Sequence, residues 1–158
     1  MENNTFCVMP WLHLHAWPNG EAYLCCIGDT GNPESVVGDI SKDSIADIMN
    51  NDKMKSIRKD MLAGKKIPNC KNCYKVEEIK GYSWRKGFNE QFEDVIPSIL
   101  ENTAEDGTID PKLLYVDFRF SNLCNLECRT CSGELSSSIA NTEGRNFSDK
   151  YIETLKDK

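Results

Sequence analysis

The sequence predicts an α/β fold divided into two units, and three observations support this prediction. Apolar and polar residues alternate around a Pro-Asn-Gly turn near the N-terminus, which is typical of a β-hairpin. Apolar residues at helical spacing follow, and a β-branched and aromatic run over residues 113–121 then has the composition of a buried strand. We therefore expect a small cysteine-rich α+β unit over residues 1–105 and a second unit, beginning with a strand, over residues 106–158.

The N-terminal hairpin is predicted by a period of two on either side of the turn at residues 18–20, with extended backbone resuming over residues 21–25. In a regular hairpin Cys7 would overshoot Cys25, unless Pro10 turns the chain back. The alternating residues are Trp11, His13, His15 and Trp17 on one side and Leu12, Leu14 and Ala16 on the other. Histidine can bind metal, but we interpret the two histidines as packed or surface side chains.

Helices are predicted next. Residues 41–64 have the spacing of two short helices, with Asp43 or Ser44 as the N-cap and Gly64 as the end. A Cys-x2-Cys turn at residues 70–73 follows.

A third helical stretch is predicted over residues 74–91, with Pro97 as a kink or stop. Residues 82–85 in this stretch form an aromatic and basic cluster, which we interpret as part of a solvated helix with a few core aromatics, the alternative being a contact with a substrate or with the other unit. The polar residues 101–112 contain Gly and Pro and mark the boundary between the two units.

The second unit begins with the strand over residues 113–121, and a cysteine-rich loop follows it at once. Asp117 and Arg119 alternate with apolar residues on this strand, so we expect their side chains to lie on one face of it. Residues 133–143 can begin a helix, and residues 147–158 have the pattern of a second amphipathic helix.

Composition narrows the function classes. The chain carries 25 acidic and 19 basic side chains, which argues against a general nucleic-acid binder. It has no apolar run long enough to span a bilayer and no signal-peptide pattern, so we expect a cytoplasmic protein without a membrane partner. Disulfides are disfavoured in that compartment, and the eight cysteines are therefore expected to be metal ligands or redox centres.

Three of the cysteines, Cys124, Cys128 and Cys131, lie on the loop after the predicted strand. Thiolates suit iron–sulfur clusters and zinc, and four of them would close either site. Three thiolates on one loop would hold three irons of a four-iron cluster and leave the fourth iron open to a small molecule. The alternatives are a zinc loop completed by a distant ligand, or three structural thiols.

The Cys-x3-Cys-x2-Cys spacing, the preceding strand and the surrounding residues RFSNLCNLECRTC resemble the radical S-adenosylmethionine superfamily. The resemblance implies that Cys124, Cys128 and Cys131 hold a [4Fe-4S] cluster whose open iron binds S-adenosylmethionine. Reductive cleavage of that cosubstrate then gives methionine and a 5′-deoxyadenosyl radical, which abstracts hydrogen from a substrate. Thr130 departs from the family, which often has an aromatic residue at that position.

A second set, Cys7, Cys25, Cys70 and Cys73, is similar to the start of the SPASM/Twitch auxiliary-cluster domain, with Gly20 at the expected spacing. The resemblance implies an auxiliary [4Fe-4S] cluster with four protein ligands, hence electron transfer or structure. The single-cluster Twitch form fits better, because the cysteines of a second auxiliary cluster are absent. A structural zinc site is the alternative. The unit precedes the radical motif, whereas the family usually places it after the barrel. Cys26 is an extra thiol beside Cys25, and it is the alternative ligand to Cys25.

Together the resemblances imply the beginning of a partial (β/α)6 radical S-adenosylmethionine barrel after a small α+β domain, with Asp117 and Arg119 of its first strand pointing into the barrel interior. Such a barrel needs about six strand–helix units of some 30 residues each, so we expect the N-terminal part of a larger enzyme, inactive alone. The implied partners are S-adenosylmethionine, a peptide or small-molecule substrate and an electron donor such as flavodoxin or ferredoxin. Two other functions remain open: a zinc-stabilised binding module and a two-cluster electron carrier.

Overall fold

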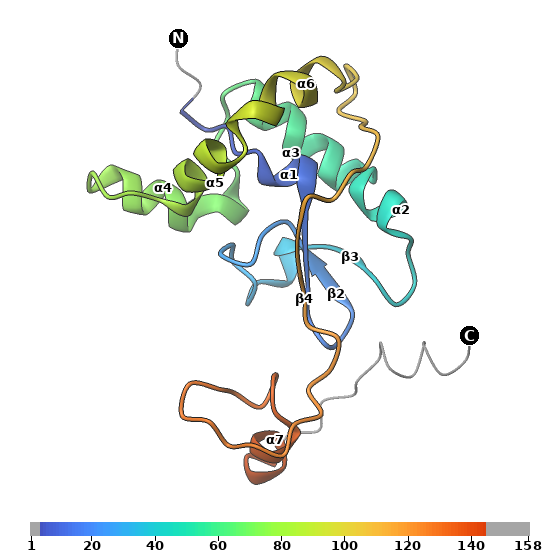
Figure 1. Ribbon diagram of the computed structural model, residues 1–158, viewed down its shortest axis with the longest axis vertical. Coiled ribbons are helices and arrows are strands. Elements are labelled where there is room, and N and C mark those ends of the chain that lie inside the picture. Colours follow the sequence, from blue (N-terminus) through green and yellow to red (C-terminus); the bar gives the residue numbers. More distant parts are fainter. Residues whose placement is uncertain (1–3, 145–158) are drawn as a thin grey trace.

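The computed structural model describes residues 4–144, which form a small α/β domain around a mixed, open sheet of four strands in the order β3-β2-β1-β4. Helices α1 to α6 gather at one end of the molecule, the sheet lies in the middle, and α7 with its preceding loop lies at the other end (Figure 1). The strands are β1 (His13–Ala16), β2 (Glu21–Tyr23), β3 (Val36–Asp39) and β4 (Tyr115–Phe118). The α-helices are α1 (Met9–Leu12), α2 (Ile45–Met49), α3 (Asp52–Leu62), α4 (Lys71–Glu78), α5 (Trp84–Gln91), α6 (Ile96–Glu101) and α7 (Ser137–Thr142). Single 3-10 turns are η1 (Pro33–Ser35), η2 (Pro68–Cys70) and η3 (Glu93–Val95).

The predicted N-terminal hairpin is confirmed, but it is shorter than expected. β1 and β2 pair antiparallel, and the amide of Gly20 donates to the carbonyl of Trp17 to close the turn. Gly20 has φ of +88°, a conformation that side chains with a Cβ rarely adopt. β2 already ends at Tyr23, so the expected extended backbone does not reach Cys25.

The residues before β1 form helix α1, although the alternation had predicted a strand from Trp11. Pro10 lies in the first turn of this helix, where its fixed φ fits and its missing N–H is not needed. A helix advances about 1.5 Å per residue against about 3.3 Å in a strand, so α1 holds Cys7 close to the hairpin. This is why Cys7 does not overshoot Cys25.

The two short helices predicted over residues 41–64 are confirmed as α2 and α3. Ser44, rather than Asp43, caps α2 by accepting a hydrogen bond from the Asp47 amide. Asn51 caps α3 in the same way. The segment after α3 turns at Gly64, whose φ is +74°.

The single helix predicted over residues 74–91 is wrong, because the chain breaks there into α4 and α5. Gly81 lies in the break, against the Val76 side chain, and Ser83 caps the new helix. Pro97 does not stop a helix either. It lies in the first turn of α6, a position that tolerates proline well.

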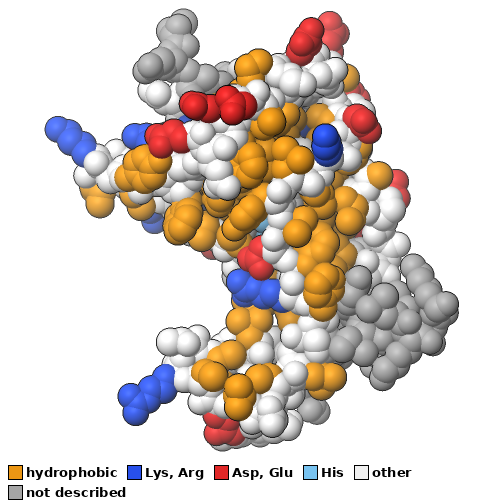
Figure 2. All heavy atoms as spheres, in the orientation of Figure 1, with side chains coloured by type: hydrophobic (Ala, Val, Ile, Leu, Met, Phe, Trp, Pro, Cys, Tyr) orange, Lys and Arg blue, Asp and Glu red, His pale blue; other side chains and the backbone are white. Residues whose placement is uncertain are grey.

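Strand β4 corresponds to the predicted strand over residues 113–121, but it is shorter and only partly buried. It pairs parallel with β1 and forms one edge of the sheet, and residues 4–144 show no barrel. Exposed apolar side chains on β4 and on the residues beside it join those of the next loop, and apolar atoms gather over this face in Figure 2. They are Leu114, Val116, Phe120, Leu123 and Leu126, exposed by 44% to 71%.

Asp117 and Arg119 do not point into a barrel. Asp117 faces His15 of the neighbouring strand, and the Arg119 guanidinium lies over the Trp17 ring, 4.4 Å from its centroid. The division of the chain at residue 105 stays a prediction, although β4 joins the same sheet as β1.

Helix α7 confirms the helix predicted from residues 133–143, and Ser136 caps it. The amphipathic stretch 147–158 lies outside the described residues. No helix within residues 4–144 is long and apolar enough to cross a membrane.

The core lies between the sheet and the helices, and α1 and α3 contribute most to it. The guanidinium of Arg58 is buried inside this core and donates to the carbonyls of Met49, Gly107 and Pro10 at 2.6 to 2.9 Å. The fully buried apolar side chains include Val8, Met9, Leu14, Met49, Met54 and Met61.

Candidate metal centre

Four cysteines from separate segments line one pocket: Cys7, Cys25, Cys70 and Cys73. Cys7 precedes α1 and Cys25 follows β2. Cys70 ends the turn η2, and Cys73 lies in the first turn of α4. The fold therefore brings together the cysteines that the sequence grouped as the auxiliary set, across as many as 66 residues (73 minus 7).

The pocket is apolar, and this affects the thiols. Burial raises the pKa of Cys7 to about 12, and it also raises the pKa of Cys70 and Cys73. Neighbouring thiolates add to the increase, because Cys7 and Cys73 both disfavour a charge on Cys70. Four thiolates are therefore costly here without a positive centre, and a bound metal would supply one. Apolar lining comes from Met9, Pro10, Leu24, Ile27, Trp84 and Phe88.

The spacing of the four thiols indicates which metal centre suits them. Ligands of one zinc ion, bound at about 2.3 Å, would lie within about 4 Å of one another. Among the described residues, no three of these thiols belong to a group whose ligand atoms all lie within 4.8 Å of one another. In an iron–sulfur cluster each thiolate binds a different iron, so the thiolates stand further apart. The arrangement fits a cluster better than a single ion.

Arg85 is the charged residue of this pocket, and the sequence reasoning missed its role. Its side chain is buried and pairs with Glu77, while its Nη1 donates to the carbonyl of Phe6 at 2.7 Å. The aromatic and basic cluster at residues 82–85 was the signal that could have found it. Because Phe6 precedes Cys7, Arg85 also fixes the backbone that carries the first thiol.

The comparisons with known proteins agree with this arrangement. The scan against family models matches residues 7–74 to SPASM, described as an iron–sulfur cluster-binding domain. Residues 7–74 are a SPASM domain. The match covers all four cysteines of the pocket, and no radical S-adenosylmethionine core domain is detected. No curated protein and no solved structure matches the chain.

Iron–sulfur cluster binding is thus the function of the SPASM domain, and the four-cysteine pocket is the part of it that fits a cluster. Cys25 lines this pocket and Cys26 does not. The assignment of individual ligands remains a prediction.

The other predicted set, Cys124, Cys128 and Cys131, lies on an irregular loop between β4 and α7, at the opposite end of the sheet from α1 (Figure 1). The amide of Cys124 donates to Oγ of Ser137, and Oγ of Ser136 donates to the carbonyl of Leu126 at 2.7 Å. The loop is therefore fastened to the first turn of α7. Cys128 is exposed, and the loop thiols form no close ligand group in the described part of the chain.

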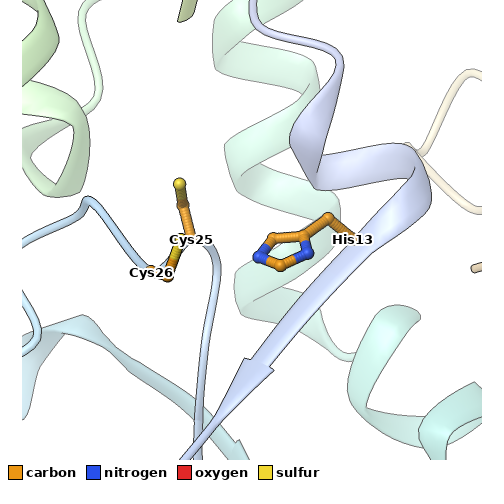
Figure 3. Close-up of side chains that lie close together, drawn as sticks. All are labelled: His13, Cys25 and Cys26. Atoms are coloured by element: carbon orange, nitrogen blue, oxygen red, sulfur yellow. The ribbon is translucent and has the colours of Figure 1, made fainter. Parts of the chain in front are cut away.

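A third arrangement was not expected from the sequence. His13, Cys25 and Cys26 bring Nε2 or Nδ1 and two Sγ atoms within 4.8 Å of one another, and Figure 3 shows the imidazole edge turned toward the two cysteines. Adjacent residues of a strand would point to opposite faces, but β2 ends at Tyr23, so Cys25 and Cys26 are free of that restriction. Hydrogen bonding from the Cys25 thiol lowers the pKa of Cys26.

Proposed function

We propose that this chain has the function of a radical S-adenosylmethionine enzyme and that its SPASM domain holds an auxiliary [4Fe-4S] cluster. The main support for the proposal is that one apolar pocket of the SPASM domain is lined by Cys7, Cys25, Cys70 and Cys73. SPASM domains are typical of radical S-adenosylmethionine enzymes. The strand-then-cysteine-loop arrangement around β4 supports the rest of the proposal.

The auxiliary cluster, when bound, would supply one-electron chemistry. In the proposal Cys7, Cys25, Cys70 and Cys73 hold it, and the saturated ligand set leaves no iron for substrate. The apolar side chains of Met9, Leu24 and Phe88 keep water from the pocket, and Arg85 places a positive charge beside it.

The loop after β4 has a different role in the proposal. Cys124, Cys128 and Cys131 would hold a second [4Fe-4S] cluster, and their three thiolates would leave it able to bind S-adenosylmethionine. The hydroxyls of Ser136 and Ser137 hydrogen-bond to the loop backbone, so α7 fixes the position of the loop that carries the thiols. The chemistry of such a cluster would require electrons from an external donor such as flavodoxin or ferredoxin, and the substrate would be a peptide or a small molecule.

The experiment is electron paramagnetic resonance of the anaerobically reconstituted and reduced chain, with and without S-adenosylmethionine, together with an iron count. The proposal predicts about eight irons per chain, and a signal that shifts when the cosubstrate is added. The Cys124→Ala, Cys128→Ala, Cys131→Ala triple variant should lose the shifting signal and about half of the iron.

The two parts of the proposal fail separately in this experiment. Iron without a response to S-adenosylmethionine would leave the SPASM domain as a cluster carrier and remove the radical chemistry from this chain. Zinc without iron would instead favour a zinc-stabilised binding module.

A further inference from the structure

His13 lies fully buried on β1, and its two ring nitrogens differ in their contacts. Nδ1 lies 2.9 Å from the carbonyl oxygen of Tyr115, whereas the buried Nε2 makes no hydrogen bond of normal geometry and has the Cys26 thiol as its polar neighbour. A buried polar atom without such a hydrogen bond costs about 1–3 kcal/mol, so a native structure that keeps one needs a reason.

The contact with Tyr115 fixes the form of the ring. A carbonyl oxygen can only accept, so the proton of neutral His13 is on Nδ1. Nε2 then carries a lone pair, which is the form in which histidine binds metals. A backbone carbonyl on the other ring nitrogen is also the usual outer support of a metal-binding histidine.

The lone pair on Nε2 has suitable neighbours. Cys25 and Cys26 place both thiols in the same close group as His13, with all ligand atoms within 4.8 Å of one another (Figure 3). Among the described residues, no other group of three or more possible ligand atoms lies this close together. Such spacing suits one ion rather than a cluster.

We propose that Nε2 of His13 and Sγ of Cys25 and Cys26 form a binding site for one borderline-soft divalent ion, such as zinc. One imidazole and two thiolates are a ligand set that zinc accepts, with the fourth position left to water or another donor. The site is distinct from the four-cysteine pocket, which contains neither His13 nor Cys26.

Cys25 belongs to both ligand sets. One thiolate cannot serve both sites independently, so the ion site is available when the four-cysteine pocket is empty. Insertion of a cluster into that pocket would then withdraw Cys25 and release the ion. The ion site itself does not depend on the proposed function, and it is tested on protein without iron.

The test is zinc X-ray absorption on the reduced, iron-free full chain loaded with one equivalent of zinc. The chain used for this test carries the substitutions Cys70→Ser and Cys128→Ser, so that neither the four-cysteine pocket nor the set of three loop cysteines is complete. The chain has only two histidines, so any imidazole scattering must come from His13 or from His15. The proposal predicts one imidazole and two sulfur ligands.

Matched variants locate the imidazole. His13→Asn keeps a donor near the position of Nδ1 and removes Nε2, so the imidazole scattering should disappear. His15→Asn is the control, because His15 has the same contact of Nδ1 with a β4 carbonyl but is outside the group. It should keep the signal. Sulfur-only coordination, or loss of the signal in His15→Asn alone, would overturn the proposal.

A second measurement covers the case in which His13→Asn fails to fold, which circular dichroism would show. Cys26 is only half-buried, so Cys26→Ser should fold. It should weaken zinc binding by at least about tenfold, as loss of even an outer-shell partner does. Cys131→Ser in the same background is the control and should bind zinc normally. Equal affinities in the two serine variants would contradict the assignment.

Discussion

Nδ1 of His13 donates a hydrogen bond to the carbonyl oxygen of Tyr115 over 2.9 Å, from a fully buried ring on β1 to the backbone of β4. His15 repeats this contact two residues later, with Nδ1 3.0 Å from the carbonyl oxygen of Asp117. The two histidines therefore join β4 to the hairpin through side chains as well as through the strand ladder. Through β4 they also connect the SPASM domain to the cysteine loop.

The stability of the chain should depend on pH through His15. Burial lowers the pKa of His15, and the charge of Arg119 lowers it further. The nearby Asp117 acts in the opposite direction, but the pKa remains below its usual value. Cys26 and the Tyr23 ring also face His15. Above about pH 6.5 the histidine is neutral in both the folded and unfolded states. As the pH falls further, the unfolded state binds the proton more readily, so stability decreases by up to about 1.4 kcal/mol per pH unit.

The measurement is the denaturation midpoint of the reconstituted chain at pH 7.5 and pH 5.5, compared with that of His15→Asn. The variant should lose less stability on acidification than the native chain. An equal loss in both would show that His15 does not titrate in this way.

Arg58 should be essential for folding, since its guanidinium satisfies three buried carbonyls from separate segments. Arg58→Met leaves those carbonyls without donors and should lower the free energy of unfolding by at least about 3 kcal/mol. Lys59→Met, at an exposed position of the same helix, is the control and should change it by less than about 0.5 kcal/mol. Chemical denaturation measures both, and a loss below about 1 kcal/mol in Arg58→Met would contradict the role.

Two glycines with positive φ should respond differently to alanine. A Cβ at Gly107 would lie 2.6 Å from the carbonyl oxygen of Lys55, whereas a Cβ at Gly64 would meet nothing within 4 Å. Gly64→Ala should therefore cost about 1 kcal/mol from backbone strain alone. Gly107→Ala should cost at least twice as much, because backbone must move. Thermal unfolding compares the two, and equal costs would argue against the contact.

Arg85 should raise the reduction potential of the auxiliary cluster, because its positive charge lines the pocket and favours the more negative reduced form. Arg85→Gln should lower the potential, since it also leaves Glu77 without its ion-pair partner. Lys86→Gln, on the exposed side of the same helix, should leave it unchanged. Redox titration followed by paramagnetic resonance measures both variants. A potential unaffected by Arg85→Gln would place the cluster elsewhere.

Local patterns in the sequence predicted several elements of the fold correctly. The Pro-Asn-Gly turn predicted the hairpin, and a serine before an apolar helical pattern predicted the start of α2. The resemblance to the SPASM/Twitch spacing also grouped Cys7, Cys25, Cys70 and Cys73, and the structure brings these four cysteines into one pocket. Such features depend on neighbouring residues or on recognised spacing.

Other features depend on tertiary contacts and were not predictable in the same way. The period of two continues through Trp11, yet α1 forms because the buried side chains of Met9 and Leu12 pack in the core. The burial of Arg58 requires three distant carbonyls, which no local pattern shows. The close group of His13, Cys25 and Cys26 arises from the turn after β2, where strand alternation no longer applies.

The central claim is that the four-cysteine pocket of the SPASM domain holds an iron–sulfur cluster. The most direct test is an iron count with Mössbauer spectroscopy on the reconstituted Cys124→Ala, Cys128→Ala, Cys131→Ala variant, which lacks the loop thiols. We predict about four irons per chain in a single cluster, lost when Cys70→Ala and Cys73→Ala are added. Iron that survives those two further substitutions, or a chain that takes up zinc and no iron, would contradict the claim.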